Sequence, residues 1–332
     1  MAGRREDVLL TPNPELTALH RKIAKKELHE NPEHIAAHIT SLRRWITSMK
    51  HLEYPDDDRV YSAFLRHAKY EHSVAQGRMD NFATLRTSEK CSTSKWFILP
   101  PISDPVVERY LNSGIHIPVG FLDDGTFLFI VRPAALDKEN FPVEFVLKFV
   151  TFHMDRIFED PRVQICGIRL FMDMTNVSSK LMQKMNPAKN FKEIIKMFQE
   201  GYPARIKTFI YYNEPIWMDQ LLKIMFTWMK PKLRERIIRS KSDITKAFAK
   251  VHGLQAILPR EYGGDNRSIN DIIAERNAWF RKQYDEPTIW TGIKVDESKR
   301  PESAKHYLKE YKEYSEHSMG HAGTFVQLPQ SD

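Results

Sequence analysis

Residues 202–237 read YPARIKTFIYYNEPIWMDQLLKIMFTWMKPKLRERI and combine three kinds of sequence. Residues 204–213 are rich in β-branched and aromatic side chains, which predicts a strand. Pro215 then starts an apolar run up to Lys230 whose polar side chains fall on one stripe, so a helix is expected there. Basic residues follow this helix. A strand that leads directly into a helix is the repeating unit of an α/β protein.

The preceding region shows the same alternation of strands and helices. Asp124-Gly125 separates two apolar runs and predicts a tight hairpin. Residues 141–160 predict a helix, residues 163–174 a buried strand, and residues 186–203 another helix. This order predicts an α/β fold with a mixed, mostly parallel sheet flanked by helices.

The two ends of the chain differ from this central part. Residues 16–95 contain four apolar patterns with a helical period and predict an all-helical module. Residues 268–284 predict one more helix, and the charged tail from about residue 291 is expected to be loosely ordered. The expected divisions are a flexible N-terminus at 1–15, a helical domain at 16–95, a sheet domain at 96–265, and a C-terminal helix with its tail at 266–332.

Composition is that of a globular protein that is not secreted. The chain has 332 residues, of which 42% are hydrophobic and 28% are charged. No apolar run reaches the ~18 residues that a membrane-spanning helix needs, and the N-terminus lacks the apolar core of a secretory signal. Two cysteines, Cys91 and Cys166, give no disulfide framework. We expect a cytoplasmic protein.

Positive charge is concentrated in one region. Residues 180–260 carry 17 Lys and Arg against 6 Asp and Glu, a net charge of +11, whereas the whole chain has +7. Such a region predicts an anionic partner, either a nucleic acid or a membrane surface. A basic face that is simply solvated is the alternative. Aromatic residues in this region alternate with aliphatic ones, which is not typical of nucleic-acid binding, so we expect no nucleic-acid partner.

Sequence motifs of catalysis and metal binding are not found in the chain. It has no Gly-x-Ser-x-Gly elbow, no Gly-rich phosphate loop before a helix and no Cys-x-x-Cys pair. His34 and His38 have helical spacing but lack the glutamate of a zinc-protease helix. This pattern favours a binding protein over an enzyme, with no catalytic residues, no metal site and no cofactor apart from a bound ligand.

The apolar helix expected at residues 216–230 has two interpretations. Its side chains could be half-buried in an ordinary core. Alternatively, its methionines suit a wall that accepts a movable ligand, because Met is flexible and polarizable. Trp217 and Trp228 near its ends suit a membrane interface.

Six short blocks in order resemble the CRAL-TRIO lipid-binding family, most closely its α-tocopherol transfer protein branch. The blocks are AFLRHAKYEHSVAQ at 63–76, CGIRLFMDM at 166–174, GYPARIKTFIYYNEP at 201–215, MKPKLRERI at 229–237, ILPREYGG at 257–264, and VDESKRP at 295–301. The last is similar to the ending of many insect members. One departure concerns a family arginine, which is replaced by Ala68, so a head-group contact from that position would be lost.

The resemblance implies a helical CRAL-TRIO N-terminal module, followed by a sheet that encloses an apolar tunnel for one lipid. The implied wall residues are Val150, Met154, Met172, Ile194, Phe198, Ile206, Phe209, Ile216 and Leu222. A mobile gate helix would present Trp217, Met218, Leu221, Met225, Phe226 and Met229. Binding of phosphoinositide head groups would use Arg205, Lys207, Arg234, Arg236, Arg239 and Lys241. Arg205 and Lys207 are two positions apart on the expected strand, so their side chains should point the same way.

The expected function is that of a cytosolic monomer that binds a tocopherol, retinoid or similar lipid. It would associate transiently with phosphoinositide-containing membranes and release the lipid there. The alternative is a lipid-modifying hydrolase that uses a similar pocket. The sequence does not identify the lipid.

Overall fold

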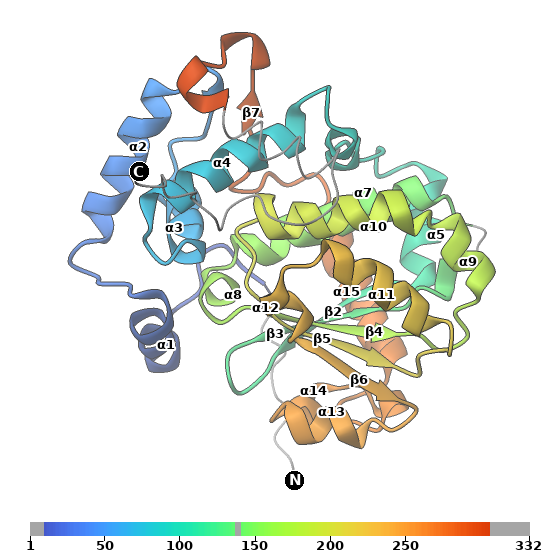
Figure 1. Cartoon of the computed structure of the whole chain (residues 1–332). Coiled ribbons are helices and arrows are strands. Elements are labelled where there is room, and N and C mark those ends of the chain that lie inside the picture. Colours follow the sequence, from blue (N-terminus) through green and yellow to red (C-terminus); the bar gives the residue numbers. More distant parts are fainter. Residues whose placement is uncertain (1–9, 137–140, 306–332) are drawn as a thin grey trace, which may run out of the picture.

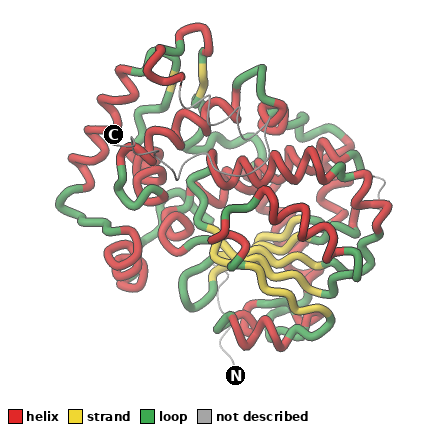
Figure 2. Tube along the Cα trace, in the orientation of Figure 1, coloured by secondary structure: helices red, strands yellow, loops and turns green. Residues whose placement is uncertain are grey.

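The structure is a computed structural model that describes residues 10–136 and 141–305. A five-stranded sheet with the order β2-β3-β4-β5-β6 lies at its centre (Figures 1 and 2). The pair β2–β3 is antiparallel, and the three other pairs are parallel. The predicted mixed, mostly parallel sheet is confirmed. The strands are β2 His116–Phe121, β3 Phe127–Val131, β4 Ile168–Asp173, β5 Ile206–Tyr212 and β6 Ile237–Lys241.

The predicted hairpin joins β2 to β3. Gly125 has a φ of 78°, which a glycine adopts without strain, and its N–H donates to the carbonyl of Leu122 at 2.9 Å. The side chain of Asp124 accepts from the backbone N–H of Thr126 at 2.9 Å. This local chemistry sets the turn, as the Asp-Gly pair predicts.

The strand expected at residues 163–174 is shorter than predicted. Its first part belongs to helix α8 (Pro161–Cys166), and β4 begins only at Ile168. Gly167 separates the two with a φ of 91°, and a Cβ atom there would lie 2.4 Å from the carbonyl oxygen of Arg205. The continuous apolar sequence therefore gave no indication that a helix ends at Cys166 and that Gly167 makes the turn into β4.

Both faces of the sheet are covered by helices (Figure 1). On one face, here called the front face, lie α7 (Val143–Glu159), α10 (Pro187–Lys196) and α11 (Met218–Trp228). The opposite face packs against helices that follow β6 in the chain. The apolar cluster on the opposite face consists of strand residues and helix residues. The strands contribute Ile117, Leu128, Phe171, Ile210 and Ile238, and the helices contribute Ala247, Leu254 and Ile272.

The N-terminal helical module is present as predicted. Its helices are α1 Ala18–Leu28, α2 Ile35–Ser48, α3 Asp58–His67 and α4 His72–Thr87. One buried cluster runs from Ile39 in this module through Phe129 in the sheet to Trp290 near the C-terminus. The module, the sheet and the C-terminal segment therefore share a core, and the expected division at residues 95 and 265 stays a prediction.

Residues 291–305 do not form the loosely ordered tail that their charge predicted. Strand β7 (Lys294–Val295) pairs with β1 (Leu52–Glu53) of the N-terminal module. Trp290 is fully buried, and Arg300 donates to both carboxylate oxygens of Asp80 in α4 at 2.6 and 2.7 Å. We call residues 284–305 the C-terminal strap. The part of the tail beyond residue 305 lies outside the described residues.

Several shorter elements complete the fold. They are η1 Ser92–Phe97, α5 Pro105–Ser113, α9 Ser179–Lys184, the π-helical turn η2 Met197–Gly201, α12 Pro231–Arg234, α13 Thr245–Lys250, α14 Leu254–Ile257, η3 Arg260–Tyr262, α15 Ile269–Gln283, η4 Glu297–Lys299 and η5 Glu302–Ala304.

Candidate functional site

Apolar side chains gather on the front face of the sheet, beneath α7, α10 and α11. Two apolar clusters meet on this face. One is the cluster that the sheet shares with the N-terminal module, and the other lies between the sheet and α5, α7 and α11. Eight of the nine residues expected to form the wall belong to, or pack against, one of these clusters. Buried among them are Met154, Ile206 and Leu222, whereas Val150, Met172, Ile194, Phe198 and Phe209 are only half-buried. Phe209 packs against both clusters, so the two adjoin.

Ile216 is the exception among the expected wall residues. It lies in the turn before α11, and its side chain is 94% exposed. This position corrects the expectation, because so exposed a side chain is not part of an interior wall. Ile224, on α11 itself, is 49% exposed.

Helix α11 begins at Met218, three residues later than the sequence predicted, after a turn at Pro215. Of the six residues expected on its gate face and ends, Met218, Leu221 and Met229 are buried, and Trp217, Met225 and Phe226 are half-buried. The predicted polar stripe is exposed, and it comprises Asp219, Gln220, Lys223, Thr227 and Lys230.

A pocket of about 500 Å³ with many basic side chains lies beside the front face, where the N-terminal module meets the sheet domain. We call it the basic pocket. It brings together three of the six cations that the sequence singled out, namely Arg205, Lys207 and Arg236. Its other charged or titratable lining residues are Lys26, Glu27, His29, His67, Lys69, Arg78, Lys230 and Lys232.

The other three cations do not line the basic pocket. Arg239 bonds two carboxylates, Glu214 at 2.8 Å and Asp219 at 2.6 Å. Arg234 is exposed and donates to the carbonyl of Met229 at 2.8 Å, and Lys241 is exposed at the end of β6. The six cations therefore do not form one site, which corrects the expectation.

Arg239 connects β6 to the start of α11. Glu214 precedes α11, and Asp219 lies in its first turn. Burial raises the pKa of the Glu214 carboxyl, and Arg239 opposes this shift without cancelling it. We refer to these contacts as the Arg239 latch, because they hold the beginning of α11 against the sheet edge.

Arg205 and Lys207 point to the same place, as their spacing predicted. Both donate to one oxygen of Glu27 in α1, at 2.7 and 2.8 Å. The strand is irregular here, because Ile206 pairs with Ile168 whereas Thr208 pairs with Arg169, which leaves Lys207 as an extra residue. Partial burial raises the pKa of the Glu27 carboxyl, but hydrogen bonds from Lys207 and Arg205 outweigh this effect, so the net shift is downward.

Arg78 of α4 contributes a half-buried cation to the basic pocket. Its guanidinium donates to the carbonyls of Tyr202 at 2.6 Å and Gln199 at 2.5 Å. Its Nε atom has no hydrogen-bond partner among the described residues. Desolvation lowers the pKa of Arg78 to about 10, although Glu200 opposes the shift. The group still remains charged at neutral pH.

Lys69 modifies the conclusion drawn from Ala68. Ala68 is buried and does not line the pocket. The next residue, Lys69, has a left-handed φ of 53° and does line it. A cation is therefore present one position away from the missing arginine.

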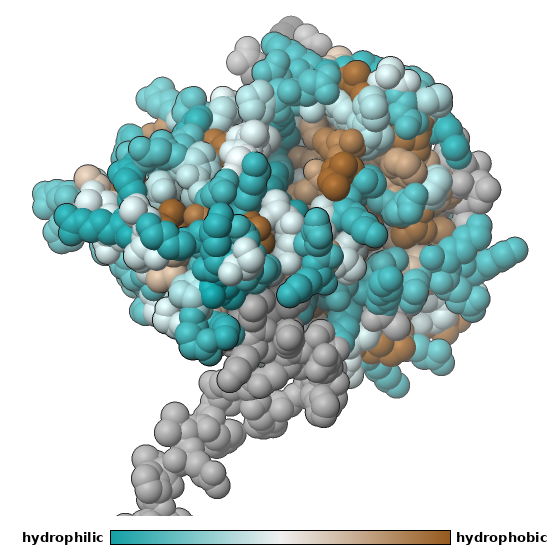
Figure 3. All heavy atoms as spheres, turned by 90° about the horizontal axis from the view of Figure 1, so that it is seen from above, coloured by the Kyte–Doolittle hydropathy of each residue, from teal (hydrophilic) through white to brown (hydrophobic). Residues whose placement is uncertain are grey.

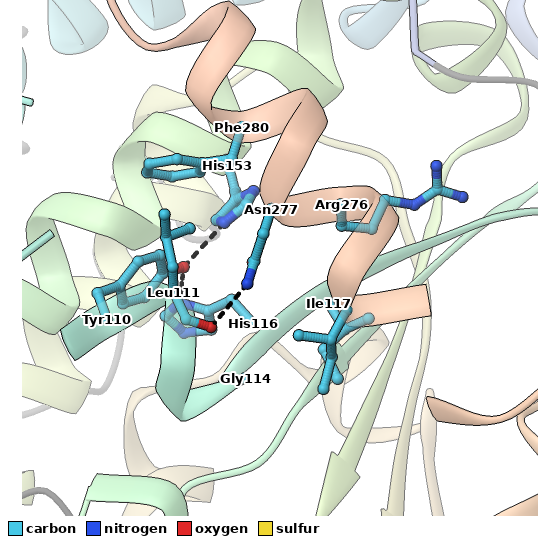
Figure 4. A pocket seen from close by; sticks show the side chains of 10 residues that line it. Tyr110, Leu111, Gly114, His116, Ile117, His153, Arg276, Asn277 and Phe280 are labelled. Atoms are coloured by element: carbon cyan, nitrogen blue, oxygen red, sulfur yellow. Dashed lines mark hydrogen bonds between the residues drawn. The ribbon is translucent and has the colours of Figure 1, made fainter. Parts of the chain in front are cut away.

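A closed cavity of about 10 Å³ lies at the other end of the sheet, near β2 and α15 (Figure 4). Beside it, the hydroxyl of Tyr110 lies between two histidines, 2.9 Å from Nδ1 of His116 and 2.8 Å from Nε2 of His153. Tyr110 has one proton to donate, so one imidazole accepts and the other donates. Nδ1 of His153 has no hydrogen-bond partner among the described residues, so the assignment that leaves no buried N–H unpaired makes His153 Nε2–H the donor.

This pair of buried imidazoles should make stability depend on pH. Burial lowers the pKa of His116 to about 3, and burial together with His116 lowers the pKa of His153 well below its usual value. The unfolded chain takes up protons below pH ~6.5, whereas the folded chain does not, so stability is complete above that pH and declines toward pH ~3. Each imidazole should cost about 2 kcal/mol of unfolding free energy between pH 7 and pH 5.

Urea unfolding at pH 7 and at pH 5 measures this effect. In the His153→Gln variant the loss of unfolding free energy between the two pH values should be about 2 kcal/mol smaller than in the wild type. The exposed His252→Gln variant controls for the loss of a histidine. An equal loss in His153→Gln and in the wild type would contradict the assignment.

The face of the molecule seen in Figure 3 is divided by polarity. Hydrophobic atoms gather on the half where α5, α7, α9 and α10 lie in Figure 1, whereas the other half is mainly hydrophilic. In residues 10–136 and 141–305 no helix combines the length and the apolar character needed to cross a bilayer. The same residues contain no group of three or more potential metal-binding side chains.

Sequence reasoning missed most residues of the basic pocket for two different reasons. Lys69 lies in the AFLRHAKYEHSVAQ block and Lys230 and Lys232 in the MKPKLRERI block, so the signal for them was present. Lys26 and Glu27 lie outside every block. Glu27 is 178 and 180 residues from its two partners, and no local pattern could join them.

Comparison with known proteins identifies the fold family. Residues 111–264 match the CRAL/TRIO domain. Clavesin-2 of Rattus norvegicus is 25% identical over 243 residues, which cover 73% of this chain and 72% of that protein. Alpha-tocopherol transfer protein-like of Mus musculus is 26% identical over 275 residues, which cover 80% of this chain and 76% of that protein.

Among solved structures, the crystal structure of Sfh5 matches with a TM-score of 0.45 and 13% identity, covering 90% of this chain and 99% of that one. The sequence matches indicate no enzyme family and support a lipid-binding class in general. Residues 111–264 therefore match the CRAL/TRIO domain, and the chain as a whole is similar to clavesin-2 and to alpha-tocopherol transfer protein-like.

Proposed function

We propose that this chain is a lipid-binding and transfer protein that holds one hydrophobic ligand between the sheet and helices α7, α10 and α11. Relatives named alpha-tocopherol transfer protein-like support this class of function and make a tocopherol a first candidate cargo. Retinoids and similar hydrophobic lipids are further candidate ligands. In this proposal the protein is a cytoplasmic monomer.

The half-buried front-face side chains support this proposal most directly. Side chains in a filled protein core pack at crystal-like density and are excluded from solvent. Here five apolar side chains of the two front-face clusters remain partly accessible, and they are Val150 on α7, Met172 on β4, Ile194 on α10, Phe198 on η2 and Phe209 on β5. Such a lining of apolar and aromatic groups suits a lipid tail.

In this proposal helix α11 is the gate through which the lipid leaves. Moving it away in water would expose Met218, Leu221 and Leu222, which are buried, at ~1.5 to 3 kcal/mol each. The Arg239 latch adds charged hydrogen bonds that hold the start of the helix. A bilayer would accept the same apolar side chains, and the exposed Ile216 and Ile224 would meet it first.

The basic pocket supplies the attraction to anionic membranes. It carries eight Lys and Arg side chains and one carboxylate among its lining residues. Each basic residue near an anionic surface contributes roughly 1 kcal/mol. Several such contributions give reversible docking without permanent residence. Phosphoinositides suit the pocket because their phosphates can accept from several cations at once.

The alternative of a lipid-modifying hydrolase gains no support. The matches indicate no enzyme family, and they give no position for a nucleophile beside a base. The lipid-transfer proposal therefore stands as the better account of the front face.

A transfer assay tests the proposal. Organic extraction and mass spectrometry of the purified protein should yield one hydrophobic lipid. Fluorescent α-tocopherol, or the extracted lipid if it differs, is then followed from donor to acceptor vesicles. Transfer by the wild type should be faster when acceptors contain phosphatidylinositol bisphosphate, and Arg205→Glu with Lys207→Glu should remove about 90% of that acceleration, because two attractive charges become repulsive.

Two comparisons make this assay decisive. A matched control reverses two exposed cations outside the basic pocket, Lys246→Glu with Lys250→Glu, which gives the same change in net charge. Protein that carries no lipid and transfers none would overturn the proposed function. Equal acceleration in the pocket variant and the control would remove the pocket from the membrane step.

A further inference from the structure

The basic pocket already contains an anion that belongs to the protein. The carboxylate of Glu27 accepts from Arg205 at 2.7 Å and from Lys207 at 2.8 Å. The residues that line this pocket in the described part of the chain include no other carboxylate. Two charged hydrogen bonds to one oxygen are what a phosphate oxygen would make with the same two groups.

Glu27 lies on the solvent side of the cations that it binds. Its side chain is 39% exposed, whereas Arg205 is 14% exposed and Lys207 is 27% exposed. Arg205 is held from below as well, because it also donates to the carbonyl of Ile165. An incoming anion that is to bind Arg205 and Lys207 through the N–H groups that now bond Glu27 must therefore displace this carboxylate.

The position of Glu27 in its helix is unfavourable without these partners. It is the second-last residue of α1, where the helix dipole disfavours negative charge. The neighbouring residues Lys25 and Lys26 have the sign that this helix end prefers. Arg205 and Lys207 thus compensate a carboxylate that the helix alone would not stabilise.

Release of the carboxylate would not require α1 to unfold. The helix is anchored by Ala24 and Leu28, which pack against Ile165 and Cys166 of α8. Glu27 is not part of this apolar contact, and its side chain is more than one-third exposed. A change of its side-chain rotamer is therefore sufficient to clear the two cations.

We infer that Glu27 is a built-in competitor that occupies the anion site until a polyphosphate head group displaces it. This inference rests on the proposed function of the basic pocket. The Glu27 carboxylate would set a threshold for the charge of the ligand, because a singly charged anion gains little free energy by replacing a carboxylate. A ligand with several phosphates gains contacts with Lys69, Lys230 and Lys232 in addition to the two released cations.

Substitution of the competing carboxylate tests the inference. Glu27→Gln keeps the shape and removes the charge, and Glu27→Ala removes the side chain. Binding is measured with soluble inositol trisphosphate and with phosphatidylcholine vesicles that contain phosphatidylinositol bisphosphate or, at matched charge, phosphatidylserine. Both variants should bind the two polyphosphate probes about tenfold more tightly than the wild type, because a charged hydrogen-bond pair no longer competes.

The phosphatidylserine arm tests the threshold. Phosphatidylserine binding, which is too weak in the wild type to displace the carboxylate, should become measurable in the same two variants. Glu33→Gln is the matched control, since it removes the same charge from an exposed glutamate outside the pocket and should change affinity less than twofold. The soluble probe shows whether the head group alone suffices, and the vesicles show whether a lipid surface is needed.

The outcomes separate this inference from the proposed function. If the wild type binds the polyphosphate probes and neither Glu27 variant binds them more tightly than Glu33→Gln does, the competitor role is wrong and the anion site stands. If the double variant Arg205→Glu with Lys207→Glu binds the polyphosphate probes as tightly as the wild type does, the assignment of the anion site to these two residues is wrong. Lipid extraction is independent of both results.

Discussion

Replacing Arg300 with methionine is expected to lower the free energy of unfolding by about 3 to 5 kcal/mol. Arg300 donates to both carboxylate oxygens of Asp80, and their side chains are 2% and 1% exposed. His51 bonds the same carboxylate at 2.7 Å, and Arg300 also donates to Thr84 at 3.0 Å. Without Arg300 the buried Asp80 carboxylate keeps its bond to His51 but loses the guanidinium that balances its charge, which costs far more than a surface pair contributes.

Urea unfolding followed by circular dichroism measures this loss. The neighbouring Lys299→Met variant is the control, because Lys299 is 60% exposed and its pair with Asp296 lies at the surface. It should change the free energy of unfolding by less than ~1 kcal/mol. A similar small change in Arg300→Met would show that the strap is not held by this contact.

Replacing Trp290 with alanine should cost a comparable amount, about 3 to 5 kcal/mol. The indole is fully buried and stands edge-on to Phe64 and Phe82, with ring centroids 6.0 and 5.5 Å away. Its Nε1–H donates to the carbonyl of Asp155 at 2.9 Å. Alanine therefore leaves a large cavity between three parts of the chain and removes the hydrogen bond to Asp155.

Trp290→Phe separates packing from hydrogen bonding. Phenylalanine keeps most of the buried surface but lacks the donor, so we expect it to recover more than half of the alanine loss. Trp279→Ala, at a half-buried tryptophan outside the strap, gives the comparison for a less buried site. If Trp290→Ala were no more destabilising than Trp279→Ala, the strap would not contribute a core residue.

The sheet domain was predictable because its signals are local. An Asp-Gly turn, a proline before α11 and alternating apolar runs each act over a few residues. Strand β6 was not predicted, because Ile237 and Ile238 are flanked by Arg236 and Arg239 and look like part of a basic run. Its position at the sheet edge, beside β5, supplies the hydrogen bonds that the sequence pattern does not indicate.

The candidate site was predictable only where the family blocks reach it. Arg205 and Lys207 lie in one block, and their common direction follows from their spacing. The position of their common partner Glu27 does not follow from any local pattern, since it lies 178 and 180 residues away in the sequence. The strap was misjudged for the same reason: Arg300 looks solvated in sequence, whereas it pairs with the buried Asp80 of the N-terminal module 220 residues away.

Because the strap is synthesised long after the N-terminal module that it contacts, synthesis imposes an order on assembly. Asp80 leaves the ribosome 220 residues before Arg300 does. At ~5 to 20 residues per second this delay is about 10 to 45 seconds. During that time the nascent helical module has a buried aspartate without its arginine and a gap where Trp290 will insert. The N-terminal helices of this protein can complete their core only after the strap has been synthesised, so chaperones have the greatest opportunity to bind them before that moment.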